Sequence, residues 1–157
     1  MVLHKAALVM WNKKWDIRNL PESYNIQDLG ADETVLEWHT THSGRFDASI
    51  EEVWHLVTHV GYANAYPDIF GEREGTKVAN AMDIARGGRF TTIPNYYPNN
   101  AWYTYNDKTC DYNCMVTEYV YWAMTSILGT QENRIVAIAP RSIKPFVHSW
   151  QTFLNYN

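Results

Sequence analysis

The sequence predicts a single α+β domain over residues 1–157, mostly helical and with a small sheet. Three segments, 49–60, 75–86 and 110–128, carry the residues that start or stop helices. The segment 34–41 is rich in β-branched and aromatic residues and alternates partly between apolar and polar side chains, which is typical of a strand. No internal repeat and no linker rich in proline or glycine divides the chain. We therefore expect one domain, with the sheet beside the first helix.

Composition and charge exclude several classes of protein. The chain has 13 basic and 17 acidic residues, a formal net charge of −4, whereas nucleic-acid binding requires a clustered basic surface. Hydrophobic residues make up 46% and charged residues 19%, which is typical of a folded globular domain. The early apolar run 6–11 is far shorter than the roughly 20 residues that cross a bilayer, and it makes a poor signal peptide. We expect no membrane contact, and the compartment and oligomeric state stay open.

The chain before residue 49 is harder to assign. Residues 3–15 are apolar and fit a helix or a strand equally well. Residues 18–33 contain Pro21 and Gly30 together with several Asn and Asp residues, and are expected to form a connection. The predicted strand 34–41 follows this connection.

The segment 49–60 predicts the first helix. Ser49 stands three residues before Glu52, which is the spacing of a capping box. Four apolar residues then recur at helical intervals and predict one buried face. Gly61 is expected to end the helix. The four apolar residues are Ile50, Val53, Val57 and Val60.

The second half of the chain predicts two more helices joined by a loop. The helix 75–86 ends at a pair of glycines, and the helix 110–128 is closed by Gly129. Between them, 91–107 contains two prolines and a run of amides, which predicts a loop or a short hairpin. The remaining tail holds an apolar run, two prolines and a further helical segment at 147–156.

Two histidines give the strongest chemical signal. His55 and His59 lie four residues apart, so on a helix their imidazoles share one face and can bind one metal ion. A third ligand must come from elsewhere, and Glu118 is the candidate. It lies in the apolar helix 110–128, where a carboxylate is costly unless it is paired, hydrogen-bonded or bound to metal. The alternative is that the histidines are ordinary polar or hydrogen-bonded residues and that Glu118 pairs with an arginine or a tyrosine.

This arrangement resembles the zincin metallohydrolases of the type with a glutamate ligand. The resemblance covers about residues 34–129, and it implies that zinc is held by His55, His59 and Glu118 with one position left for water. The family motif is His-Glu-x-x-His, and its glutamate is the general base. This chain has Leu56 at that position, so the resemblance supports a metal site better than it supports catalysis. Glu52 shares a helix face with the histidines and is the substitute base, although its capping-box role is the simpler interpretation.

Aromatic residues in the segment 96–105 suggest a contact surface. Tyr97, Trp102 and Tyr105 could line a substrate site, and Tyr103 could reach the metal and stabilise an oxyanion. The simpler interpretation is that these rings cover the edge of the core. The sequence therefore predicts a zinc-dependent hydrolase that cleaves a peptide or amide bond in a peptide or small-molecule substrate. A module that binds a peptide or a carbohydrate without catalysis is the alternative.

Other polar residues have structural interpretations. Cys110 and Cys114 are buried thiols or a local disulfide, and a bridge requires that Cys110 precede the helix. Together with two histidines they could instead form a closed zinc site, although the usual short cysteine spacing is absent. Asp83 and Arg86 are expected to form a salt-bridged or capping pair rather than a catalytic one, and a surface pair of this kind contributes little. Asp107 is expected in a turn or at the start of the following helix.

Overall fold

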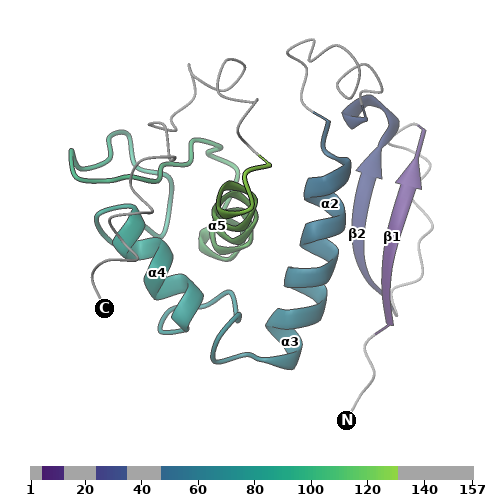
Figure 1. Cartoon of the computed structure of the whole chain (residues 1–157), viewed down its shortest axis with the longest axis horizontal. Helices are drawn as coiled ribbons and strands as arrows, with labels where there is room; N and C mark the ends of the chain where they lie inside the picture. Colours follow the sequence, from purple (N-terminus) through teal and green to yellow (C-terminus); the bar gives the residue numbers. More distant parts are fainter. Residues whose placement is uncertain (1–4, 13–23, 35–46, 131–157) are drawn as a thin grey trace.

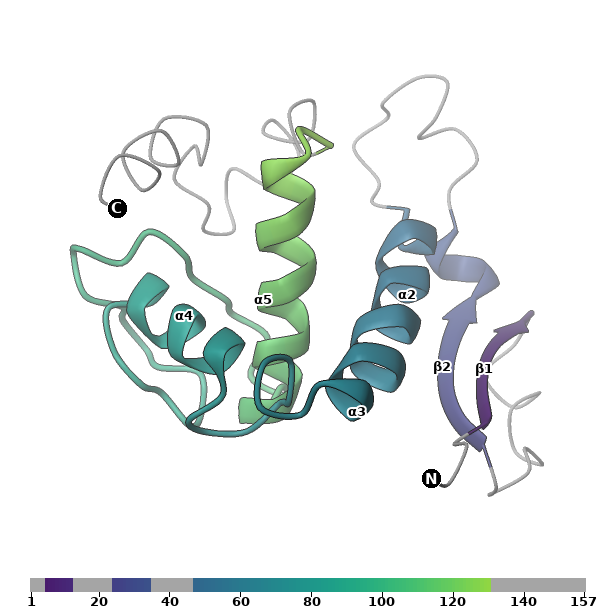
Figure 2. The same cartoon turned by 60° about the horizontal axis from the view of Figure 1, so that its bottom comes forward.

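The computed structural model describes residues 5–12, 24–34 and 47–130, and within these ranges the fold is α+β. A two-stranded sheet packs against a long helical segment, a central helix lies on the other side of that segment, and a shorter helix and a loop cover the central helix (Figure 1). Figure 2 shows the same order from a second direction. The elements are β1 (Lys5–Trp11), β2 (Tyr24–Gly30), η2 (Ala31–Glu33), α2 (Ser49–His55), η3 (Leu56–Tyr62), α3 (Ala63–Ala65), α4 (Lys77–Ala85) and α5 (Tyr112–Ile127).

The sheet consists of β1 and β2, which run parallel with Lys5 opposite Tyr24 and Trp11 opposite Gly30. The indole nitrogen of Trp11 donates a hydrogen bond of 2.8 Å to Asp28 across the pair. The prediction of a connection over 18–33 is therefore wrong for 24–30. Strand pairing and the packing of Leu29 outweigh the polar composition of this segment, because β propensity depends strongly on context.

The predicted helix 49–60 is confirmed as α2 followed by η3, and α3 extends it to Ala65. The expected end at Gly61 is wrong, because Gly61 lies inside η3. The capping box is also wrong. Ala48 is the N-cap, Asp47 accepts the hydrogen bond of the Ser49 backbone N–H at 2.8 Å, and Glu52 accepts a hydrogen bond from Gln27 of β2 instead.

The buried face of this helix differs from the predicted one. Ile50, Val53 and Val57 are almost half exposed, whereas His55 and Val60 are buried. Ile50 and Val53 lie in α2, so their exposure follows from which face of this helix packs against β2 and α5. Val57 lies in η3, a π-helix whose hydrogen bonds run from residue i to i+5, so its position also differs from the one that an α-helix would give it.

The core lies between α4 and α5, and both helices were predicted. Thr76 accepts a hydrogen bond from Ala79 at the start of α4, and Asp111 accepts one from Cys114 at the start of α5. Gly129, with φ of 73°, follows α5 in the left-handed conformation that glycine adopts most easily. The core residues are mainly small or aromatic: Ala79, Met82, Ala85, Tyr103, Cys110, Met115, Val116, Tyr119 and Ala123.

The ion pair of Asp83 and Arg86 is present, with 2.8 Å between Oδ1 and Nη2. The expectation that it lies on the surface is wrong, because the arginine side chain is completely buried. Its guanidinium group also contacts the sulfur of Met115 at 3.0 Å and the carbonyl oxygen of Phe90 at 3.3 Å. Arg86 is therefore part of the core under α5.

A disulfide joins Cys110 to Cys114. Cys110 precedes α5 and Cys114 lies in its first turn. The structure therefore meets the condition that Cys110 must come before the helix for a disulfide to form. The neighbouring Asp107 accepts hydrogen bonds from Thr109 in a turn, as predicted, and these bonds lower the pKa of its carboxyl group. The bridge thus holds the loop that enters α5 against the helix.

Removing this bridge is expected to lower the stability of the fold modestly. The cysteines are only four residues apart, and closing so short a loop restricts the unfolded chain by about 2 kcal/mol. For a chain of this length we expect the Cys110→Ser/Cys114→Ser variant to melt about 4–8 °C below the wild type in a calorimetric scan. A reductant should lower the wild-type melting temperature similarly and leave that of the variant unchanged. Equal melting temperatures of wild type and variant would contradict a disulfide between Cys110 and Cys114.

Among the described residues, none of the helices combines the length and apolar character needed to cross a membrane. The predicted strand 34–41, apart from Thr34, lies outside the described residues, as does the predicted helix 147–156.

Candidate metal centre

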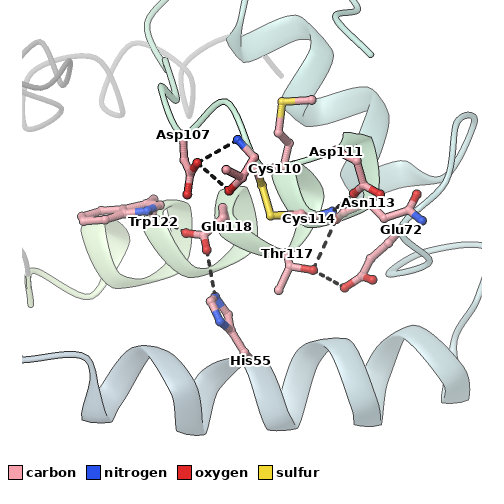
Figure 3. Close-up of a disulfide and its surroundings, with 12 residues drawn as sticks. His55, Glu72, Asp107, Cys110, Asp111, Asn113, Cys114, Thr117, Glu118 and Trp122 are labelled. Atoms are coloured by element: carbon pink, nitrogen blue, oxygen red, sulfur yellow. Dashed lines mark hydrogen bonds and ion pairs between the residues drawn. A yellow bond between two sulfur atoms is a disulfide. The ribbon is translucent and has the colours of Figure 1, made fainter. Parts of the chain in front are cut away.

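His55 is the last residue of α2 and lies at the interface between α2 and α5. The residue is only 5% exposed. Its ring makes an edge contact with Tyr121 of α5, with 5.9 Å between centroids. Nε2 points toward Glu118, 3.9 Å from Oε1 (Figure 3). This separation exceeds a hydrogen bond, and Nε2 has no hydrogen-bond partner among the described residues.

Glu51 completes a group of three ligand-type side chains. It stands one helical turn before His55, and one carboxylate oxygen each from Glu51 and Glu118 lies within 4.8 Å of the other and of a ring nitrogen of His55. The group is half-buried at its two glutamates and buried at its histidine. One imidazole and two carboxylates so placed could hold a metal ion.

Glu52 lies on the opposite side of the histidine ring. Its Oε2 is 3.8 Å from Nδ1 of His55, and it also accepts the hydrogen bond from Gln27. Histidines that bind metals commonly direct their second ring nitrogen toward a carboxylate, which orients the ring. Glu52, predicted as a general base, lies beside the second ring nitrogen of His55 and is hydrogen-bonded to Gln27.

Glu118 is held from several directions. The indole nitrogen of Trp122 donates to its Oε2 at 3.2 Å, and the hydroxyl of Tyr105 donates to the same carboxyl group. Burial raises the pKa of Glu118 above its usual 4.5, although His55 and the hydrogen bonds oppose this rise. Tyr105 is thus a tyrosine partner of the kind expected if Glu118 has a structural role and binds no metal. Glu118 is thus a fixed carboxylate facing His55.

His59 does not join this group. It follows His55 through the π-helix η3, and its side chain is 48% exposed. Its Nδ1 lies 2.6 Å from Oε2 of Glu72, and the other oxygen of Glu72 accepts a hydrogen bond from Thr117. The hydrogen bond to Glu72 is the main reason that the pKa of His59 is raised above 6.5. The predicted pair of histidines is therefore split between two different carboxylates.

The aromatic loop contributes mainly to the core. Tyr103 is 1% exposed and packs edge-on against Tyr119, and burial raises the pKa of its hydroxyl well above 10. The Tyr97 hydroxyl donates to the backbone carbonyl of Tyr105 at 2.8 Å. Trp102 and Tyr105 pack against the same core. These placements match the simpler interpretation of the segment 96–105.

Two residues were missed in the sequence: Glu51 of the cluster, and Glu72, which pairs with His59 outside it. Glu51 had a usable signal, because it lies one helical turn before His55 in a segment already predicted as a helix. Glu72 had no such signal, because it lies in the irregular segment between α3 and α4. Its approach to His59 and Thr117 depends on the tertiary fold.

Comparisons with protein-family models, curated proteins and solved structures returned no match to this chain.

Proposed function

We propose that this protein is a zinc-dependent hydrolase of peptide or amide bonds, and that Glu51, His55 and Glu118 hold the metal. The observation that carries this proposal is the buried Nε2 of His55, which lies 3.9 Å from Oε1 of Glu118 and has no hydrogen-bond partner in the described part of the chain, with the carboxylate of Glu51 in the same cluster. A buried polar atom without a partner costs about 1–3 kcal/mol. A cation at this position would remove that cost and would take the place of the hydrogen bond that joins the carboxyl groups of Glu51 and Glu118.

The donor set favours zinc over magnesium or calcium. Zinc binds imidazole nitrogen and carboxylate oxygen at about 2.0–2.2 Å, whereas magnesium and calcium prefer oxygen ligands alone. Three protein ligands are also typical of catalytic zinc sites, which keep a further position open. The set differs from the one that the zincin resemblance implies, because Glu51 takes the place of His59.

A zinc ion in such a site activates water and polarises the carbonyl group of the substrate. The protein side chains would fix the ligands in place. Glu52 lies 3.8 Å from the second ring nitrogen of His55, on the side from which a carboxylate can orient the ring, and Trp122 and Tyr105 hold the carboxyl group of Glu118. Such support makes the site rigid enough for catalysis.

The proposal is tested by metal analysis of protein purified without a nickel column. We expect about one zinc ion per chain after dialysis against zinc. In calorimetric titration, Glu118→Gln should weaken zinc binding by at least tenfold. Glu74→Gln is the matched control, because Glu74 is an exposed carboxylate that pairs with Arg89 and lies outside the cluster. Equal zinc affinities of wild type and Glu118→Gln would overturn the site.

The hydrolase part of the proposal needs its own measurement. The zinc-loaded protein should hydrolyse labelled casein or a peptide p-nitroanilide, and a chelator should remove this activity. A protein that binds zinc but hydrolyses neither probe would contradict the enzymatic function. A protein that binds no zinc would instead favour the module that binds a peptide or a carbohydrate.

A further inference from the structure

A second pair of an imidazole and a carboxylate lies next to the proposed metal site. His59 contacts Glu72 through Nδ1, and Glu72 contacts Thr117 of α5 through its other oxygen. Thr117 directly precedes Glu118 in α5 (Figure 3). Both pairs therefore connect the helix of His55 to neighbouring residues of α5.

The two pairs differ in their access to water. The side chain of His55 is 7% exposed, whereas that of His59 is 48% exposed. Because Glu72 engages Nδ1, the tautomer of neutral His59 is fixed with its proton on Nδ1, and Nε2 is the nitrogen that can accept a proton. A half-exposed imidazole held by a carboxylate is a suitable group for exchanging protons with water.

The other candidate bases are occupied or misplaced. Leu56 stands where the zincin motif has its glutamate and cannot accept a proton. Glu52 lies on the Nδ1 side of His55, away from Glu118, and accepts the hydrogen bond from Gln27. Tyr103 lies in the core. Among the described residues, His59 combines a titratable ring, exposure to solvent and a position one turn from His55.

We propose that His59 is the proton-transfer residue of this hydrolase and that Glu72 is its positioning residue. The inference rests on the proposed function. In the step we assign to it, the oxygen of water bonds to the acyl carbon and a proton from that water passes to Nε2 of His59. The bond from carbon to nitrogen then breaks, and the proton passes from His59 to the leaving amine, so no other reactant is needed.

The electrostatics agree with this role. Glu72 is the charged group that faces the ring of His59 and, through its hydrogen bond, raises the pKa of the imidazole above 6.5. Thr117, which faces Glu72 from α5, is uncharged. A raised pKa keeps the imidazole protonated to higher pH than a free histidine, so its neutral form, the one that accepts a proton, gains population as the pH rises through that pKa. The same shift stabilises the fold below pH 6.5, and that stabilisation is lost as the pH rises through the raised pKa.

The test combines a titration that does not involve metal with a rate profile. In the full-length, metal-free protein, proton NMR should show His59 titrating above pH 6.5, with the signal assigned by its absence in His59→Gln. Glu72→Gln should lower that pKa, and Glu74→Gln should leave it unchanged. In the zinc-loaded protein, the kcat for a peptide p-nitroanilide, whose scissile bond is an amide, should rise with pH through the same pKa.

The variants separate a role in catalysis from a role in structure. His59→Gln should lower kcat by about a hundredfold, with KM and zinc affinity unchanged, and should remove the ionisation from the rate profile. Glu72→Gln should move the rate profile and the NMR titration together. A profile that stays the same in His59→Gln overturns the inference alone. A tenfold loss of zinc affinity in that variant would make His59 a metal ligand and would overturn the proposed ligand set as well. A wild type without zinc binding or hydrolysis overturns the proposed function and this inference with it.

Discussion

Replacing His55 with alanine is expected to abolish zinc binding, whereas replacing His59 with alanine should leave zinc affinity nearly unchanged. The structure places His55 between Glu51 and Glu118, but it places His59 against Glu72. We expect the dissociation constant for zinc to rise by at least a hundredfold in the first variant and by less than threefold in the second. Calorimetric titration at pH 7 measures both.

This pair of variants distinguishes the two ligand sets. A zincin-type site needs both histidines, so it predicts that either substitution removes the metal. The set of Glu51, His55 and Glu118 predicts that only the first does. Since His55 is buried, its loss could also destabilise the fold. Glu51→Gln is therefore a second test of the ligand set, because Glu51 is only half-buried. Loss of zinc in His59→Ala together with retention in Glu51→Gln would refute the proposed ligands.

The contrast also shows what the sequence could predict about the site. The spacing of His55 and His59 places them about one turn apart, but it does not show which carboxylate each ring meets. His59 pairs with Glu72 of the segment between α3 and α4, and only the tertiary fold brings this acid to it. Glu118 was identified because a carboxylate in an apolar helix needs a partner, and this physical argument does not depend on helix geometry. The energetic argument therefore identified Glu118, which does lie beside His55. The helical spacing of the two histidines did not show that they meet different carboxylates.

The fold shows a similar division. The helices α4 and α5 were predicted because caps and glycines mark their ends locally. The strand β2 was missed because its polar residues form a strand only when β1 pairs with it. The ion pair of Asp83 and Arg86 was predicted from its spacing, but its burial was not, because burial depends on α5 packing over it.

Removing Asp83 is expected to have the largest effect on stability of the substitutions considered. Arg86 is fully buried, and Asp83 is its ion-pair partner at 2.8 Å. Asp83 also accepts hydrogen bonds from the hydroxyl of Tyr112 at 2.9 Å and from Arg89 at 3.3 Å. Burial and this carboxylate raise the pKa of Tyr112 to about 12, so its hydroxyl remains a donor.

Loss of one partner leaves a buried charge without compensation, which costs about 3–5 kcal/mol. Asp83→Ala should therefore lower the melting temperature of this chain by about 6–20 °C. Glu74→Ala is the matched control, because it removes the exposed partner of Arg89 and should cost less than about 1 kcal/mol. Thermal unfolding followed by circular dichroism measures both.

A second substitution identifies the cause of the destabilisation. If the cost comes from the unpaired guanidinium group, replacing Arg86 with methionine in the Asp83→Ala background removes that charge and should recover part of the lost stability. The environment favours this recovery, because Arg86 already lies against the sulfur of Met115 and near the rings of Phe90 and Tyr112. If the double variant is less stable than Asp83→Ala alone, the dominant contribution is instead the packing of the arginine stem and its contacts to Met115 and Phe90. In that case Arg86 stabilises the core mainly by filling it.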